Sequence, residues 1–160
     1  PALSGSIDYS HDSGAYAFAW MSSEGVVSDT TTDGYEVDFG AGYAGSIDDF
    51  GYDISYYTFN YPEENSHGEE TVIGLTYDMA SFTYYIGDGY DYMVLGAEFG
   101  DMSVAYGATS ADNGSDWSHI DLSFAATDSL SFTVSLPSDD GAGIAEEPLL
   151  MMSYSLPVGK

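Results

Sequence analysis

The chain has 160 residues, which suits one domain, and a formal net charge of −26, with a single residue in total from Lys and Arg. Almost nothing could neutralise phosphates, so this charge excludes nucleic acid as a partner. Aromatic residues make up 16% of the chain, which argues against a disordered acidic segment, and the lack of cysteine excludes disulfides and thiol chemistry.

Period-two alternation of apolar and polar residues extends along almost the whole chain and is typical of β-strands. The longest apolar run is residues 148–152, far short of the roughly 20 residues that a membrane-spanning helix needs. We predict eleven strands, over residues 3–10, 14–22, 34–45, 50–60, 70–78, 81–87, 91–99, 102–109, 117–126, 129–136 and 149–158.

The two sides of these strands differ in character. Along residues 34–44, Val37 and Phe39 alternate with Glu36 and Asp38, and the later strands repeat this pattern. In residues 15–22 we assign the aromatic residues to the apolar side and the alanines to the other. The acids within strands fall mostly on the small and hydroxylated side, at Asp8, Glu36, Asp38, Asp53, Glu98 and Asp121.

Short and longer connections alternate between the predicted strands. This is typical of outer-membrane barrels, in which periplasmic turns are tight and extracellular loops are long. A soluble β-sandwich has no reason to sort its loops in this way. The short connections are 11–13, 46–49, 79–80, 100–101 and 127–128, and the longer ones are 23–33, 61–69, 88–90, 110–116 and 137–148.

We therefore predict an all-β fold, an antiparallel transmembrane β-barrel. Residues 1–160 form a single domain with about eleven strands, whereas bacterial single-chain barrels close with an even number. We expect a twelfth strand before Pro1 in the natural polypeptide, because an unpaired strand edge is not tolerated in lipid.

Several segments resemble the TorF-like porin family of proteobacterial outer-membrane barrels. They are Pro1-Ala2-Leu3-Ser4-Gly5, residues 7–14 with Tyr16 and Trp20, Glu36-Val37-Asp38-Phe39 with Gly42-Tyr43, and Asp53 followed by Tyr56-Tyr57 and Tyr61-Pro62. The resemblance covers the whole chain and consists of strand and turn patterns. It implies diffusion of small solutes and a first strand with an aromatic-Arg-Gly segment.

The candidate functional site is the lumen of this barrel. Inward carboxylates would favour cations, and tyrosine rings would add cation–π attraction for alkylammonium-like solutes. The alternative is that the same groups fill the interior without conduction. The residues expected to line the lumen are Glu36, Asp38, Asp53, Glu98, His119, Asp121, Tyr57, Tyr85 and Tyr92.

Aromatic residues near strand ends predict an interfacial girdle, formed by Trp20, Tyr61, Tyr90 and Trp117. The acid-rich segments that contain Asp112, Asp116, Asp139 and Asp140 lack the spacing of an EF-hand, so we favour turn chemistry there over weak divalent-cation binding.

These patterns lead to one principal hypothesis. The chain is a porin-like channel in the outer membrane of a Gram-negative bacterium, which passes small cationic or zwitterionic solutes by diffusion, with no enzymatic activity and no cofactor. Its partners are lipid, lipopolysaccharide and solutes, with a homo-oligomer or a larger surface assembly as further options. The alternatives are a non-conducting structural or interaction barrel and a soluble secreted acidic β-protein.

Overall fold

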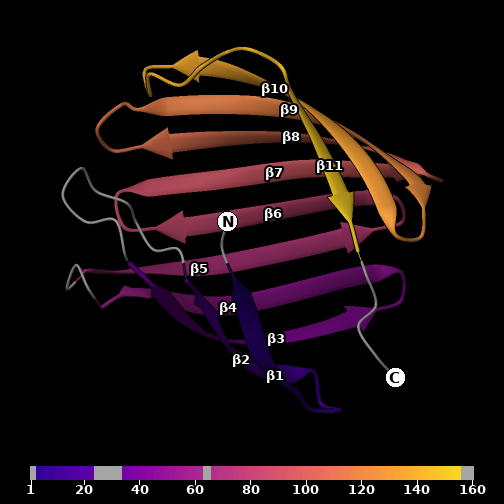
Figure 1. The fold of residues 1–160 in the computed structure, drawn as a ribbon. Coiled ribbons are helices and arrows are strands. Elements are labelled where there is room, and N and C mark those ends of the chain that lie inside the picture. The colour runs from indigo at the N-terminus through magenta and orange to yellow at the C-terminus, as the bar shows by residue number, and fades with distance from the viewer. Residues whose placement is uncertain (1–2, 24–33, 63–65, 156–160) are drawn as a thin grey trace. The chain divides into compact units, whose positions relative to one another are not determined.

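The computed structural model describes residues 3–23, 34–62 and 66–155, and within them it contains strands and no helix (Figure 1). The strands follow one another in chain order in one sheet. Their bounds are β1 Ser4–Ser10, β2 Ala15–Ser22, β3 Glu36–Ile47, β4 Phe50–Tyr61, β5 Ser66–Tyr77, β6 Ala80–Gly87, β7 Tyr90–Phe99, β8 Met102–Ala111, β9 Asp116–Thr127, β10 Leu130–Asp140 and β11 Leu149–Tyr154.

The prediction of an antiparallel all-β chain with eleven strands is confirmed. The strand order is linear, and β1 and β11 are its end strands. The structure therefore establishes an antiparallel sheet, and it does not establish a closed barrel.

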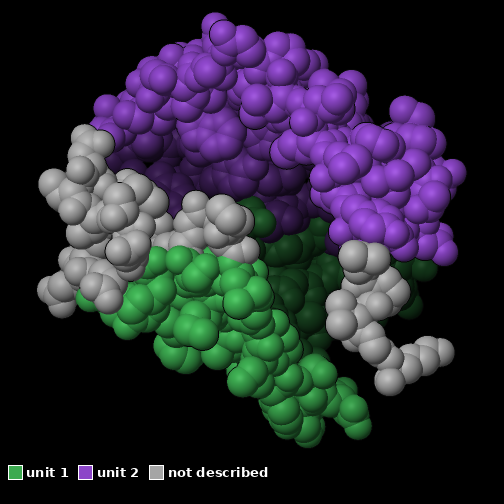
Figure 2. All heavy atoms as spheres, viewed as in Figure 1, with its two compact units in different colours: residues 1–75, 85–88 green, residues 76–84, 89–160 purple. Residues whose placement is uncertain are grey.

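The chain divides into two compact units, coloured separately in Figure 2. Unit 1 comprises residues 1–75 and 85–88, and unit 2 comprises residues 76–84 and 89–160. In unit 1, continuous ladders join β1 to β2, β2 to β3 and β3 to β4. In unit 2, equivalent ladders join β7 through β11 in succession.

In two of the hairpins, the strands are connected by a tight turn whose first residue is an aspartate. Asp48 and Asp78 have φ angles of 52° and 51°, the left-handed region that aspartate tolerates better than most residues. Such turns leave the strands on either side in direct register, as in the β3–β4 ladder from Ile47↔Phe50 to Val37↔Asn60.

The strand bounds change the predicted pattern of connections. β5 begins at Ser66, β10 continues to Asp140, and residues 88–89 form a connection as short as 48–49. The sequence predicts connections at the polar ends of these strands, because apolar and polar residues do not alternate there. Backbone hydrogen bonding does not require apolar side chains, and the end of β10 pairs fully with β9, up to Asp140↔Asp116.

The register in unit 1 defines an acidic face, which carries Glu36 and Asp38 of β3. Directly paired residues lie on the same side of a sheet. Ser6, Trp20, Asp38 and Phe59 therefore form one row across β1 to β4. The predicted facing of residues 34–44 agrees with this register, whereas that of residues 15–22 is wrong, because the aromatic residues of β2 share the acidic face.

Glycines on β3 explain this facing. A Cβ atom at Gly40 would collide with the ring of Phe18 and lie 2.5 Å from Cδ1 of Tyr57. A Cβ atom at Gly42 would lie 2.5 Å from Cζ of Tyr16. The two glycines thus leave the space that the aromatic rings of β2 occupy, and the small alanines of β2 occupy the opposite face.

Few apolar side chains are buried, and the apolar face is exposed. Val72, at 6% exposure, is the buried apolar residue among the described positions. In unit 1, Ile7 is 80% exposed on the face opposite Asp8, and Phe39 and Ile54 are also exposed. In unit 2, the alternating side chains Ile120, Leu122 and Phe124 are exposed in the same way.

Candidate functional site

The acidic face of unit 1 contains a hollow over β1, β2 and β3. It has a volume of about 390 Å³ and is lined by Ser6, Asp8, Phe18, Trp20, Glu36 and Asp38. Its residues come from three strands and meet because the register pairs Ser6 with Trp20, Trp20 with Asp38, and Asp8 with Phe18. The hollow therefore combines three carboxylates with two aromatic rings.

The three carboxylates of this hollow have different surroundings. Asp38 is only 8% exposed, and its Oδ1 atom has no hydrogen-bond partner among the described residues. Glu36 accepts a 2.8 Å hydrogen bond from the hydroxyl of Tyr61, and Asp8 accepts a 2.7 Å bond from the hydroxyl of Ser6. All of these donors are neutral, so the negative charges have no cationic partner among them.

Aromatic and hydroxyl groups continue the acidic face beyond the hollow. The hydroxyl of Tyr16 donates a 2.9 Å hydrogen bond to Asp53, and the rings of Phe18 and Tyr57 lie 5.3 Å apart between centroids. Ser55, which is buried, donates to the hydroxyl of Tyr57 over 3.0 Å. Asp53 and Tyr57 of the predicted lumen therefore share a face with Glu36 and Asp38, and each has a partner.

Unit 2 contains a second polar network, formed by Tyr92, His119 and Asp121. Tyr92 Oη lies 2.7 Å from His119 Nε2, and His119 Nδ1 lies 3.0 Å from Asp121 Oδ1. The Trp117 ring stacks on His119 at a centroid distance of 5.4 Å. Gly107 makes room for this group, because a Cβ atom there would collide with His119 and lie 2.5 Å from Tyr92 Oη.

A cavity of about 440 Å³ adjoins this network. Trp117, His119 and Asp121 line it together with Ser135, Pro137, Ile144, Ala145, Leu149 and Met151. Its lining is mostly apolar apart from these groups, and the carboxylate of Asp121 is hydrogen-bonded to histidine. His119 and Asp121 are two of the residues predicted to line the lumen, and Trp117 precedes them on the same strand. Tyr92 joins them only through the pairing of β7 with β8 and of β8 with β9.

The remaining lumen candidates are Glu98 and Tyr85. Glu98 pairs with Ser103 at the exposed end of β7, on the same side of unit 2 as Asp121. Tyr85 is a half-buried residue of β6 in unit 1.

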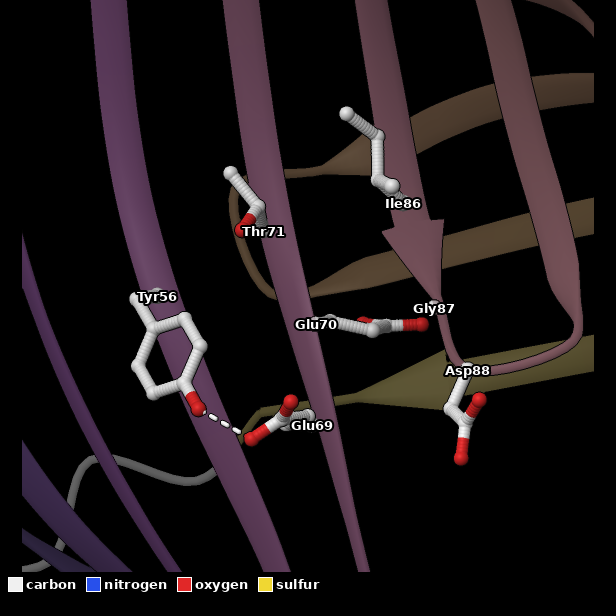
Figure 3. A pocket seen from close by; sticks show the side chains of 7 residues that line it. All are labelled: Tyr56, Glu69, Glu70, Thr71, Ile86, Gly87 and Asp88. Carbon is white, nitrogen blue, oxygen red and sulfur yellow. Dashed lines mark hydrogen bonds between the residues drawn. The ribbon is translucent and has the colours of Figure 1, made fainter.

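Figure 3 shows a hollow that sequence reasoning missed. Its volume is about 370 Å³, and its lining consists of Tyr56, Glu69, Glu70, Thr71, Ile86, Gly87 and Asp88. The hydroxyl of Tyr56 donates a hydrogen bond to Glu69, and the two side chains point toward each other in the view. The adjacent acids Glu69 and Glu70 are the available signal, but the predicted boundary at residue 70 puts Glu69 in a connection and Glu70 at the start of a strand.

Trp20 and Tyr61 lie on the acidic face of unit 1, and Trp117 and Tyr90 lie on the side of unit 2 that carries His119. Trp20 pairs with Asp38, Tyr61 bonds Glu36, and Trp117 stacks on His119. Tyr90 begins β7, two residues before Tyr92 and therefore on the same side. The register places these rings on the polar sides of their strands, and the interfacial girdle stays a prediction.

The aspartates of the two acid-rich segments lie in or beside turns and are held there by hydrogen bonds and strand pairing. Asp116 accepts a 2.7 Å bond from the backbone N–H of Ala111, and Asp139 accepts a 2.8 Å bond from that of Gly143. Asp112 donates its backbone N–H to Gly89, and Asp140 ends β10 opposite Asp116. Over the described ranges, no three His, Cys, Asp or Glu side chains converge enough to hold a metal ion.

Together, these observations define the class: an all-β protein with one antiparallel sheet, an exposed apolar face and a face of acids and aromatic rings. In the described part of the chain, no helix is both long and apolar enough to span a membrane. The chain belongs to the Gcw_chp family, described as a bacterial protein of unknown function, whose model matches residues 1–132. Comparison with curated proteins and with solved structures gave no match. The protein is thus a bacterial all-β protein, and its resemblance to TorF-like porins stays a hypothesis.

Proposed function

We propose that this chain is a transmembrane β-barrel of the Gram-negative outer membrane, whose acidic lumen passes small cationic or zwitterionic solutes by diffusion. The observation that carries the proposal is the contrast between two faces of the same strands. One face exposes large apolar side chains, and the other places a buried carboxylate beside tryptophan.

The apolar face supports a lipid environment. A soluble monomer rarely exposes a contiguous apolar patch of more than a few hundred Å². Here the exposed side chains alternate regularly along neighbouring strands, for example Leu122 on β9 and Val134 on β10, which are directly paired. A barrel strand in lipid has this arrangement, with apolar residues outward and polar residues inward.

The acidic face supports selectivity for cations. Asp38, Asp53 and Asp121 lie on polar faces, and the one basic residue among Lys and Arg is Lys160, at the end of the sequence. Carboxylates that line a narrow passage create a negative potential, which raises the local concentration of cations. The proposal includes no catalytic step and no cofactor.

Closure of the sheet is part of the proposal. An antiparallel succession of eleven strands gives β1 and β11 the same direction, so a fully antiparallel barrel has one further strand between them. We propose twelve strands in the closed barrel. This number lies between the packed eight-stranded barrels and the open sixteen-stranded porins.

A non-conducting barrel is the second candidate, favoured by one observation. Tyr16 and Asp53 are hydrogen-bonded to each other, and Ser55 is buried beneath the neighbouring rings, so part of the acidic face is filled by its own side chains. A barrel filled in this way would serve a structural or assembly role.

Planar-bilayer recording separates the two candidates. The purified chain is inserted from detergent into a bilayer under a KCl gradient, and the reversal potential is measured. We expect discrete conductance with a reversal potential of the sign for K⁺ preference. Absence of conductance favours the non-conducting barrel, and a preference for Cl⁻ refutes the acidic-lumen proposal. A chain that stays dispersed and folded without detergent refutes both membrane candidates.

A further inference from the structure

The hollow over β1, β2 and β3 contains a buried acceptor with no partner. Asp38 is more than nine-tenths buried and lines the hollow, and its Oδ1 atom has no hydrogen-bond partner among the described residues. A buried carboxylate oxygen without a partner costs free energy, and a donor brought by a ligand would remove this cost.

The described residues supply no lysine or arginine to this hollow. Asp8 and Glu36 are bonded to neutral hydroxyl groups, those of Ser6 and Tyr61. Lys and Arg together number one in the chain, at Lys160, outside the described residues. A cation from the solution can therefore compensate the three carboxylates.

The geometry favours an organic cation over a metal ion. Carboxylates that hold a metal converge on one point, and no described group of three acids or histidines does so. The volume of about 390 Å³ falls within the range of small-molecule pockets. The rings of Trp20 and Phe18 line it, and aromatic faces attract organic cations.

The Asp38 oxygen that lacks a hydrogen-bond partner indicates which organic cations suit the hollow. Oδ1 of Asp38 needs a hydrogen-bond donor, which ammonium and guanidinium groups have and quaternary ammonium groups lack. An alkyl group on the same ligand would lie against the indole ring of Trp20, which directly opposes Asp38 in the β2–β3 ladder.

We propose that this hollow binds a primary alkylammonium ion, whose N–H groups donate to Asp38 and whose alkyl group contacts Trp20 and Phe18. The inference rests on the proposed function in one respect, since solutes must reach the acidic face. With this site the passage would bind its solute saturably and select it by chemical class. Without it, the passage would select solutes by charge alone.

Calorimetric titration of the unmodified chain in detergent micelles tests the site. The probes are n-butylammonium, tetramethylammonium and potassium chlorides at equal ionic strength. We expect saturable binding of n-butylammonium, and affinity for the other two cations at least about tenfold weaker, because neither can donate an N–H group to Asp38. Equal affinity for all three cations, or no binding of n-butylammonium, overturns the inference.

Substitutions test whether the bound cation lies in the hollow. Trp117→Phe leaves Trp20 as the only tryptophan, so its fluorescence reports on the hollow directly. In this background, Asp38→Asn is expected to weaken n-butylammonium binding at least about tenfold, because it removes the charged acceptor. Asp101→Asn, which makes the same change in an exposed turn, is the matched control and should leave the affinity unchanged. Unchanged affinity in Asp38→Asn overturns the assignment.

The titration tests the binding site and the bilayer recording tests the channel, so either proposal can be contradicted without the other. Binding of n-butylammonium without conductance contradicts the channel and retains the site. Cation-selective conductance without a saturable response contradicts the site and retains the channel. Circular dichroism of each variant distinguishes loss of binding from loss of the β-sheet, and the comparison of three cations on the unmodified chain requires no variant.

Discussion

Gly40 is the position at which the packing of the acidic face can be tested most simply, by the substitution Gly40→Ala. The added methyl group would collide with the ring of Phe18 and lie 2.5 Å from the ring of Tyr57. These rings are 5.3 Å apart between centroids and flank the glycine on β2 and β4, so the methyl group would have to displace at least one of them. Overpacking of this kind typically costs about 1–3 kcal/mol.

The matched control is Gly5→Ala on β1, where an added Cβ atom meets nothing within 4 Å. Alanine is no worse than glycine in a strand, so we expect this change to stay within about 0.5 kcal/mol of the unmodified chain. Urea unfolding in detergent micelles, monitored by circular dichroism, gives the free energy of unfolding for both variants.

A second substitution identifies the cause of the loss. Phe18→Leu removes part of the ring that the new methyl group would meet, so the double variant should be less destabilised than the sum of the single variants. Equal stability of Gly40→Ala and the unmodified chain, or strict additivity in the double variant, would refute the conclusion that Gly40 makes room for Phe18.

Three further predictions follow from the two faces and the network in unit 2. Asp38→Asn and Asp53→Asn should each shift the bilayer reversal potential toward zero, because both remove negative charge from the proposed passage; an unchanged potential removes that residue from the selectivity argument. Leu122→Arg should cost about 2–4 kcal/mol in a lipid bilayer if the residue lies near the midplane, whereas Ser123→Arg on the opposite face should cost little beyond its 2.8 Å hydrogen bond to Thr133; equal losses contradict the assignment of the faces. Tyr92→Phe should lower the free energy of unfolding by about 0.5–1.5 kcal/mol through loss of the bond to His119, and an unchanged urea midpoint would show that this bond contributes nothing.

Period-two alternation was enough to predict the number of strands and their order. It works for β9 and β10 because apolar and hydroxylated residues alternate there without ambiguity, as in Leu122 and Ser123. It fails for β2, where both sets are apolar: alanine suits either face, and tyrosine and tryptophan combine a large apolar surface with a polar group. Gly40 and Gly42 on β3 carried the missing information, since a glycine opposite an aromatic residue indicates the face on which the ring lies.

The candidate site was only partly predictable from the sequence. Asp38 and Glu36 could be identified because they interrupt an apolar pattern. Their meeting with Asp8 and Trp20 depends on the register of β1, β2 and β3, and one slipped residue would move each side chain to the other face. The Tyr92–His119–Asp121 network is similar, because only the neighbouring pair on β9 could be inferred before the strands were paired.

The central claim is that one face of the sheet contacts lipid while the other contacts water, and single-cysteine scanning of β9 tests it most directly. The chain contains no cysteine, so each variant introduces a single reactive thiol. Residues 119 to 124 are replaced one at a time, the protein is reconstituted in liposomes, and labelling by a membrane-impermeant maleimide is measured.

We predict strong labelling at positions 119, 121 and 123 and protection at positions 120, 122 and 124, with the protection lost after denaturation. Uniform labelling of all six positions in liposomes would contradict the account.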